Sequence, residues 1–248
     1  MAGVAAYRSG AGLVTVAVPK SALSSVAAVR PELMTEPLDE TESGRVRFAD
    51  AERVLDLLKK MTVLAIGPGL GTEDETVRFV RRVYAEAEAP AVVDADALNA
   101  LAGALPRTDK RRILTPHPGE MGRLMARSTK EIQADRLGAA RQLAEESGAA
   151  VVLKGDRTII AFPDGEAWVN PTGTPALATG GTGDVLTGMI AGIVGQQPEA
   201  WKRALIAAVW LHGRCGELAG ARLGEQAVMA TDLLDYVPEA MNELRPAV

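Results

Sequence analysis

A glycine-rich turn that ends in an aspartate has the clearest chemical meaning of any segment in the sequence. It contains Gly181, Thr182, Gly183 and Asp184, and it leads directly into an apolar helix. Glycines let a backbone approach a ligand closely, and the N–H groups at a helix start favour anions, so the turn predicts a phosphate site. Because a carboxylate repels phosphate, Asp184 is better suited to take a proton from a hydroxyl that attacks the phosphorus.

A simpler interpretation of this turn is that Thr182 or Asp184 only caps the helix. The long stretch of Pro, Gly and Thr that starts at Asn170 favours the phosphate site, because a cap does not require it. In the helix that follows, Gly188 and Gly192 fall one turn apart on the face of Asp184. Two glycines so placed predict that this helix lies close against a neighbouring helix.

Composition narrows the class of protein. The 248 residues are 47% hydrophobic and 24% charged, which is typical of a soluble globular protein, and no linker or repeat divides them, so we expect a single domain over residues 1–248. A net charge of −5 without a basic stripe, together with 4% aromatic residues, argues against a nucleic-acid partner. The sequence has neither a long apolar run nor a signal-peptide pattern, which indicates a cytoplasmic protein without a membrane partner.

The single cysteine, Cys215, excludes an internal disulfide and fits a reducing compartment. It follows His212 at a spacing of i, i+3 within an apolar helical run. Such a pair has two interpretations, a catalytic Cys–His couple or plain helix packing. The apolar surroundings favour packing.

Short β-branched runs alternate with helical patterns along the chain. This order predicts an α/β fold with a mostly parallel central sheet and helices on both faces. The runs that we expect to be buried strands are residues 13–18, 63–66, 91–94, 113–115 and 150–154, and residues 158–162 and 166–169 should form a hairpin. Residues 49–61, 73–88 and 130–148 carry apolar side chains at helical spacing.

Most of the other glycine-rich and polar segments directly follow the predicted strands, at their carboxyl ends. In sheets of this kind ligands bind at these ends. Residues 67–71 read GPGLG, residues 95–99 contain Asp96, and residues 116–120 read PHPGE. A tight turn would also explain the first segment, and an N-cap would explain Asp96. The glycines of the first segment resemble a dinucleotide fingerprint, but the third glycine is replaced by Thr72, and no P-loop motif occurs.

His117 and Glu120 lie where a strand ends and a helix begins. Glu120 falls in the first helical turn, where a carboxylate is favoured by the helix dipole and can reach a metal directly or through water. The two prolines that flank His117 hold it stiffly, which suits contact with a ligand. Stabilisation of the helix start by Glu120, and an exposed loop position for His117, are the alternatives.

These segments together resemble a known family. The motifs GPGLG, VVDADALN, LTPHPGE, VVLKG and NPTGTPALATGGTGDVLTGMIAG occur in the order and spacing of the bacterial ADP-dependent (S)-NAD(P)H-hydrate dehydratases, members of the ribokinase superfamily. The resemblance covers nearly the whole chain, and residues 170–192 are its most specific part. It implies a hydro-lyase in which a nucleoside diphosphate phosphorylates hydrated NADH or NADPH (NADHX, NADPHX), after which loss of phosphate restores the reduced nicotinamide.

The resemblance also implies a role for each matching residue. Gly67 or Gly69, His117 and Asp184 would contact the hydrated nicotinamide, and Asp184 would be the base. Glu120 would help to place Mg²⁺, although His117 replaces the Asn of the related motif. The residues implied to hold the nucleotide, ADP or ATP, are Lys154, Gly155, Asp156, Arg157, Thr158, Gly181, Thr182 and Gly183.

One departure concerns the start of the chain. Members of the family usually begin with a further strand and a Gly/Ser-rich loop ahead of the helix that here ends near Ser9, so we expect an uncovered sheet edge and an N-terminal truncation. We also expect a homo-oligomer and a separate NAD(P)H-hydrate epimerase. Two alternatives to the dehydratase stay open: a kinase of the same superfamily acting on a hydroxymethylpyrimidine, thiazole or pyridoxal alcohol, and a nucleotide-binding module without catalysis.

Overall fold

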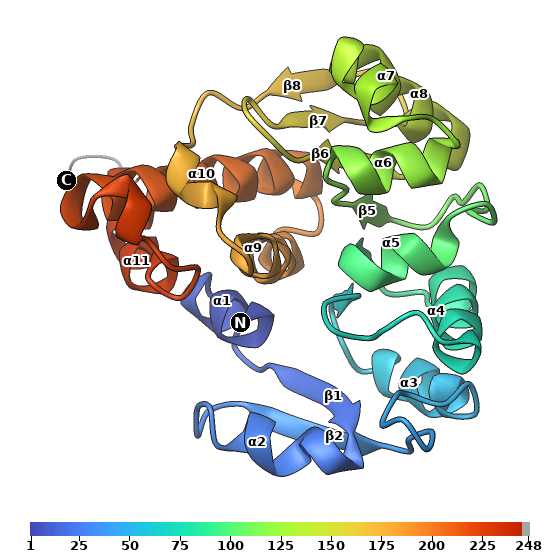
Figure 1. The fold of residues 1–248 in the computed structure, drawn as a ribbon. Coiled ribbons are helices and arrows are strands. Elements are labelled where there is room, and N and C mark those ends of the chain that lie inside the picture. The colour runs from blue at the N-terminus through green and yellow to red at the C-terminus, as the bar shows by residue number, and fades with distance from the viewer. Residues whose placement is uncertain (245–248) are drawn as a thin grey trace. The chain divides into compact units, whose positions relative to one another are not determined.

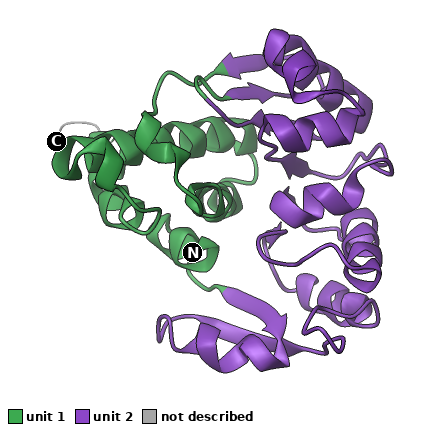
Figure 2. Cartoon of the chain, in the orientation of Figure 1, with its two compact units in different colours: residues 1–14, 156–158, 169–248 green, residues 15–155, 159–168 purple. Residues whose placement is uncertain are grey.

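The computed structural model describes residues 1–244, which divide into two compact units (Figure 2). The first unit combines Met1–Val14, Asp156–Thr158 and the chain from Val169 onward, and the second combines Thr15–Gly155 and Ile159–Trp168. No helix within the described residues is long and apolar enough to cross a membrane. The single domain expected from the sequence stays a prediction.

A mostly parallel, six-stranded sheet dominates the second unit (Figure 1). Its strands, in their order across the sheet, are β3 (Leu64–Ile66), β4 (Ala91–Val93), β5 (Arg112–Leu114), β6 (Ala150–Leu153), β7 (Ile159–Ala161) and β8 (Ala167–Val169). The first four strands pair in parallel, and β7 runs antiparallel to β6. The α/β class and the hairpin predicted from the sequence are confirmed.

Six helices of the second unit directly precede the strands of this sheet or lie between them in the sequence. They are α3 (Asp50–Leu58), α4 (Asp74–Glu86), α5 (Ala95–Leu101), α6 (Pro118–Met125), α7 (Thr129–Ala134) and α8 (Arg136–Ser147). Since β–α–β connections are right-handed, a parallel sheet that grows in one direction places its connecting helices on one face. Figure 1 accordingly shows α4, α5 and α6 in a row beside the strands.

The single helix predicted over residues 130–148 is two helices, so that prediction is wrong in its extent. Asp135 separates α7 from α8 with a non-helical φ of −145°. Its carboxylate accepts a hydrogen bond from the backbone N–H of Gly138 at 2.8 Å and so caps α8. A capping aspartate inside an otherwise helical pattern was the signal for this break.

The core of the second unit is built from the strands and the inner faces of their helices. Strands β4, β5 and β6 are buried at every residue, which confirms the prediction from their apolar runs. Leu98, Leu101, Leu114, Met121 and Leu153 are among the apolar side chains that pack together here. Interiors packed in this way tolerate little change in volume.

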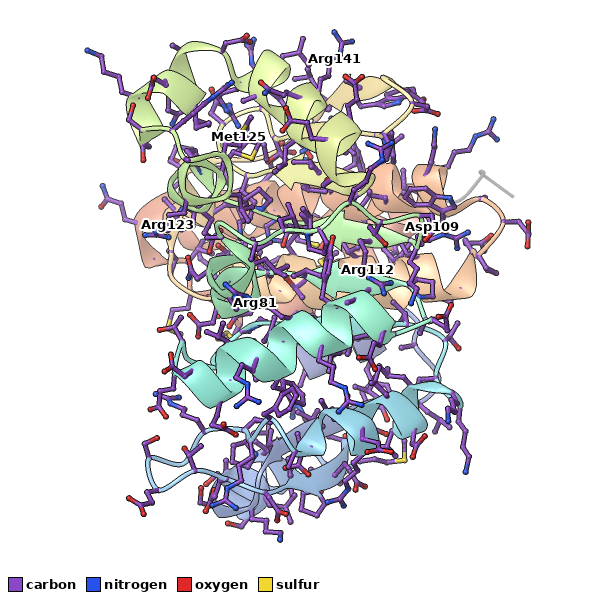
Figure 3. All side chains as sticks on the ribbon, turned by 90° about the vertical axis from the view of Figure 1, so that its right-hand side faces the viewer. Arg81, Asp109, Arg112, Arg123, Met125 and Arg141 are labelled. Atoms are coloured by element: carbon purple, nitrogen blue, oxygen red, sulfur yellow. The ribbon has the colours of Figure 1, made fainter. Side chains whose placement is uncertain are left out.

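Arg112 is a charged side chain within this core, since it is 1% exposed at the start of β5 (Figure 3). Its guanidinium donates to the carbonyl oxygens of Tyr84 at 2.9 and 3.1 Å, of Ala89 at 3.0 Å and of Ala87. Tyr84 and Ala87 lie at the C-terminal end of α4, where the helix dipole favours a cation. Burial lowers the pKa of Arg112 and raises the pKa of Tyr84 to about 12.

A separate two-stranded parallel sheet precedes the larger one in the sequence. It pairs β1 (Thr15–Pro19) with β2 (Met34–Leu38), and the short helices η1 (Lys20–Ala22) and α2 (Leu23–Ala27) connect them. The prediction of a buried strand over residues 13–18 is wrong in its burial, since Ala17 is exposed and the rest of β1 is only half-buried. An apolar run is buried on both faces only where other elements cover both, and β1 has β2 as its sole pairing strand among the described residues.

The first unit is helical. Its elements are α1 (Ala2–Arg8), η2 (Pro175–Ala178), α9 (Thr182–Gln196), α10 (Trp201–Leu223), η3 (Glu225–Ala227) and α11 (Leu233–Glu243). Val185 and Met189 of α9 pack in one apolar cluster with Leu211 of α10 and with Leu233 and Val237 of α11.

Helix α1 lies directly against α9 (Figure 1). A Cβ atom at Gly188 would lie 2.1 Å from the carbonyl oxygen of Ala2, and one at Gly192 would lie 2.7 Å from that of Ala6. Both distances are too short for a side chain, so the two backbones touch because these residues are glycine. The close approach predicted from their spacing is confirmed.

We expect Gly188→Ala to lower the free energy of unfolding by about 1–3 kcal/mol, since the new methyl group forces the two helices apart. Gly220→Ala in α10 is the matched control. A Cβ there has its nearest neighbour, Cγ of Glu225, at an ordinary 3.4 Å. This second variant should gain about 0.5–1 kcal/mol from its better helix propensity. Urea unfolding measures both changes, and a Gly188→Ala protein as stable as the parent would contradict the close packing.

Candidate active site

The carboxyl ends of the parallel strands hold one group of candidate residues, all within the second unit. Hydrogen bonds between neighbouring strands continue one residue past the strand ends. The N–H of Asp94 donates to Ile66 O at 3.0 Å, and that of Lys154 donates to Pro116 O at 2.9 Å. Asp94 after β4 and Lys154 after β6 are therefore fixed in register on either side of β5.

An ion pair joins these two residues across the end of β5. Lys154 Nζ lies 2.6 Å from Asp94 Oδ1, and the two side chains are 19% and 1% exposed. Lys154 Nζ also lies 3.8 Å from Glu120 Oε2. A carboxylate as buried as that of Asp94 requires a compensating cation, so Lys154 neutralises the acidic side chains at this edge of the sheet.

Glu120 and His117 form a reciprocal cap at the start of α6. His117 Nδ1 accepts from the backbone N–H of Gly119 at 3.0 Å and of Glu120 at 3.3 Å, while Glu120 Oε2 accepts from the N–H of His117 at 2.8 Å. Glu120 is thus a helix-stabilising residue, as the alternative interpretation expected. Its second oxygen, Oε1, lies 3.5 Å from His117 Nε2.

The GPGLG segment is a tight turn after β3. Gly67 has a φ of +136°, and a Cβ atom there would lie 1.7 Å from the carbonyl oxygen of Asp94, so no side chain fits. Gly69 has a φ of +74°, with open space around its Cα. The N–H of Gly71 donates to Asp96 Oδ2 at 2.8 Å, which ties this turn to the end of β4. The backbone at Gly69 is accessible to a ligand.

The second group of candidate residues lies in the first unit, at the start of α9. Gly181 occupies the N-cap position with a φ of +94°. The hydroxyl of Thr182 donates backward to the carbonyl oxygens of Leu177 at 2.8 Å and Thr179 at 3.0 Å. Asp184 is the third helical residue and half-buried. The N-cap position itself therefore carries no side chain, and the first amides of the helix, which have no acceptor within the helix, point out of its N-terminus.

Helix α10 supports this turn from behind. His212 is buried, and its Nε2 lies 2.9 Å from the carbonyl oxygen of Thr182. Cys215 is fully buried, and burial raises the pKa of its thiol to about 12. A thiol of this kind stays neutral and is a poor nucleophile, which supports packing over a catalytic Cys–His pair.

Residues 154–158 pass from the second unit into the first. Gly155 has a φ of +132°, and a Cβ atom there would lie 3.0 Å from Arg136 Nη2. Arg136 Nη2 in turn donates to the carbonyl oxygen of Lys154 at 3.2 Å. Arg157 has a φ of +51°, which is uncommon for a residue with a side chain. Thr158 O accepts from the N–H of Asn170 at 2.8 Å.

The candidate residues thus fall into two local groups, one in each unit. The second unit holds Gly67, Gly69, His117, Glu120, Lys154 and Gly155, and the first holds Asp156, Arg157, Thr158, Gly181, Thr182, Gly183 and Asp184. Sequence reasoning missed the pairing of Asp94 with Lys154 and the contact of His212 with the turn. A charged residue at the end of each of two apolar strands was a signal for the first, whereas no pattern marked the second.

Within the described residues, no three or more His, Cys, Asp or Glu side chains cluster in a way that could hold a metal ion. Mg²⁺ is usually held by one or two carboxylates together with substrate phosphates rather than by an all-protein cage. Glu120, buried beside Asp94 and Lys154 at the strand ends, fits the protein's share of such a site.

Comparison with known proteins relates this geometry to a family. The sequence model of the NAD(P)H-hydrate dehydratases matches residues 1–239. The bifunctional NAD(P)H-hydrate repair enzyme Nnr of Moorella thermoacetica is 45% identical over 256 aligned positions, which cover 100% of this chain and 47% of that protein. The chain therefore spans about half the length of this relative.

Two solved structures share the fold. The ADP/ATP-dependent NAD(P)H-hydrate dehydratase of Bacillus subtilis, co-crystallised with ATP and Mg²⁺ and soaked with CoA, superposes with a TM-score of 0.83 at 34% identity, over 98% of this chain and 86% of that one. A ribokinase-like superfamily protein of Enterococcus faecalis gives 0.81 at 28% identity, over 98% and 81%. The fold is ribokinase-like, and the chain belongs to the NAD(P)H-hydrate dehydratase family.

Proposed function

We propose that this chain is a hydro-lyase that uses ADP to dehydrate (S)-NADHX and (S)-NADPHX to NADH and NADPH, in repair of damaged nicotinamide cofactors. The observation that carries the proposal is the turn at Gly181–Asp184, where amides at a helix start and a carboxylate lie together in a chain of this family. Amides at a helix start favour a phosphate group, and a neighbouring carboxylate supplies a base.

In the proposed reaction the substrate hydroxyl attacks the terminal phosphorus of ADP. Asp184 takes the hydroxyl proton, a phosphorus–oxygen bond forms to the substrate, and the bond from phosphorus to the AMP oxygen breaks. The carbon–oxygen bond of the phosphorylated substrate then breaks and phosphate leaves. The neighbouring ring carbon gives up a proton to solvent, and the double bond of the reduced nicotinamide returns. Both steps conserve oxidation state, so they require no oxidant or reductant.

The proposed binding roles take residues from both groups. Gly67, Gly69 and His117 contact the hydrated nicotinamide together with Asp184. The nucleotide is bound by Lys154, Gly155, Asp156, Arg157, Thr158, Gly181, Thr182 and Gly183. The open space at the Cβ position of Gly69 supports close approach of a ligand to the backbone there.

Mg²⁺ bound with the nucleotide would neutralise phosphate charge in the transfer step. Glu120 is the proposed protein carboxylate for it. Asp94 and Glu120 carry two negative charges against the one positive charge of Lys154, so the cluster keeps one net negative charge, and phosphates would supply the other ligands that Mg²⁺ requires. The metal is therefore expected to bind with ADP or ATP rather than alone.

We further propose a cytoplasmic location and a homo-oligomer. A single buried cysteine supports a reducing compartment.

The proposal predicts that purified protein with Mg²⁺ and ADP restores the near-ultraviolet absorbance of NADH from hydrated NADH, with release of AMP and free phosphate. A superfamily kinase would instead leave a stable phosphoester, and a binding module would bind ADP without turnover. The absence of absorbance recovery with both ADP and ATP, from protein shown to be folded by circular dichroism, would refute the proposed activity.

Asp184→Asn isolates the proposed base. The substitution keeps size and polarity but removes basicity, so turnover should fall by about 10²–10⁴-fold, the usual contribution of a general base. ADP should bind at least as tightly as to the parent, because the amides remain and a nearby negative charge is gone. Asn serves at a helix start about as well as Asp, so a residue that only stabilises the helix predicts nearly normal turnover. Steady-state kinetics and ADP titration measure the two quantities.

Lys154→Met tests the ion pair. Removing the cation leaves the buried carboxylate of Asp94 uncompensated, so the free energy of unfolding should fall by about 3–5 kcal/mol. The double variant Lys154→Met with Asp94→Asn removes that charge and should recover more than half of the loss. If the double variant is as unstable as the sum of the two single variants in urea unfolding, the two side chains are not coupled.

A further inference from the structure

The carbonyl oxygen of Thr182 receives a side-chain contact from a different helix. Thr182 is the first residue of α9, and His212 Nε2 of α10 lies 2.9 Å from its oxygen. A carbonyl oxygen only accepts, so the imidazole carries its proton on Nε2 and donates it. His212 is 9% exposed, which removes water as a competing partner for this hydrogen bond.

This hydrogen bond adds a restraint on the direction of the next amide. The peptide group is planar and trans, so the Thr182 carbonyl and the Gly183 N–H point in opposite directions in one plane. Gly183 has no side chain that could restrain this plane, so its restraints are the helical hydrogen bond to the Thr182 carbonyl and the added contact from His212. The Gly183 N–H is among the amides at the start of α9 that have no acceptor within the helix, and it therefore points toward the N-terminal end.

A donor on the carbonyl side also strengthens the amide as a donor. Hydrogen bonds in a chain polarise one another, so the contact from His212 makes the Gly183 N–H more positive. The effect is greatest in a buried setting such as that of His212. Orientation and polarisation act in the same direction, toward an anion placed at the helix start.

The same turn of α10 also holds the beginning of the segment that leads to α9. The hydroxyl of Thr172 donates to the carbonyl oxygen of Trp210 at 2.8 Å. A Cβ atom at Gly213 would lie 2.2 Å from that hydroxyl oxygen, so the approach requires a glycine. Residues 210–213 thus anchor both ends of the segment from Thr172 to Thr182.

We propose that His212 is a positioning residue for phosphate binding, which aims and polarises the Gly183 amide through the Thr182 carbonyl. The inference rests on the proposed function only in taking a nucleoside diphosphate as the ligand of this turn. His212 has no direct contact with the nucleotide in this role. It acts through the backbone of Thr182 and Gly183.

The test compares His212→Leu with His212→Gln. Leucine removes the donor, whereas glutamine keeps an N–H donor at a similar distance from the backbone. We expect the leucine variant to bind ADP about 10-fold more weakly, because a misdirected Gly183 amide loses part of one hydrogen bond to a charged group, and the glutamine variant to recover most of this loss. Adenosine, which has no phosphate, should bind to all three proteins with equal affinity in calorimetric titrations.

Cys215→Ala provides the control for packing, because Cys215 is a fully buried residue of the same helix. This variant should lose stability but keep the parent affinity for ADP. The proposal is overturned if His212→Leu binds ADP within about threefold of the parent, or if adenosine affinity falls as far as ADP affinity, which would indicate a structural role. ADP binding without dehydratase turnover in the parent would refute the proposed function and leave this inference intact, and a parent that does not bind ADP would overturn both.

Discussion

The ion pair between Lys154 and Asp94 is the interaction on which the strand ends depend. The carboxylate of Asp94 is almost fully buried, and an isolated charge in such a place would cost several kcal/mol. Lys154 removes this cost by reaching across β5 from the end of β6. The carboxylate of Glu120 lies 3.8 Å from the ammonium group of Lys154 and also caps α6. The positions of the strand ends, the start of α6 and the charges of Lys154, Asp94 and Glu120 therefore depend on one another.

Regular patterns in the sequence predicted most of the second unit. The apolar runs before Asp94, before Thr115 and before Lys154 became buried parallel strands because both their faces are covered. The same type of run at β1 did not, since burial depends on neighbours that a local pattern does not contain. Strand β2 escaped prediction because Glu36 and Pro37 interrupt its apolar character, and proline is tolerated there because β2 has only β1 as a pairing strand among the described residues.

The candidate residues were predictable by type but not by partner. Glycine signals are local, and Gly67, Gly181 and Gly188 each lie where a positive φ or a backbone contact excludes a side chain. Pairings between distant residues carry no such signal. Lys154 and Asp94 are 60 residues apart, and His212 and Thr182 are 30 apart. Only the fold, which sets strand order and helix packing, brings such residues into contact.

The two groups of candidate residues, one in each unit, present charge by different physical means. At the start of α9 the charge is provided by backbone amides, whose direction depends on the contacts of Thr182 and His212. At the strand ends the charge is provided by side chains. The ion pairs of Lys154 with Asp94 and Glu120 would change if a metal and phosphates were added. Backbone amides stay where the fold places them, whereas side-chain charges can be rearranged. This difference predicts that the backbone of the α9 turn changes little when an anion binds, whereas the side chains at the strand ends rearrange when charge is added.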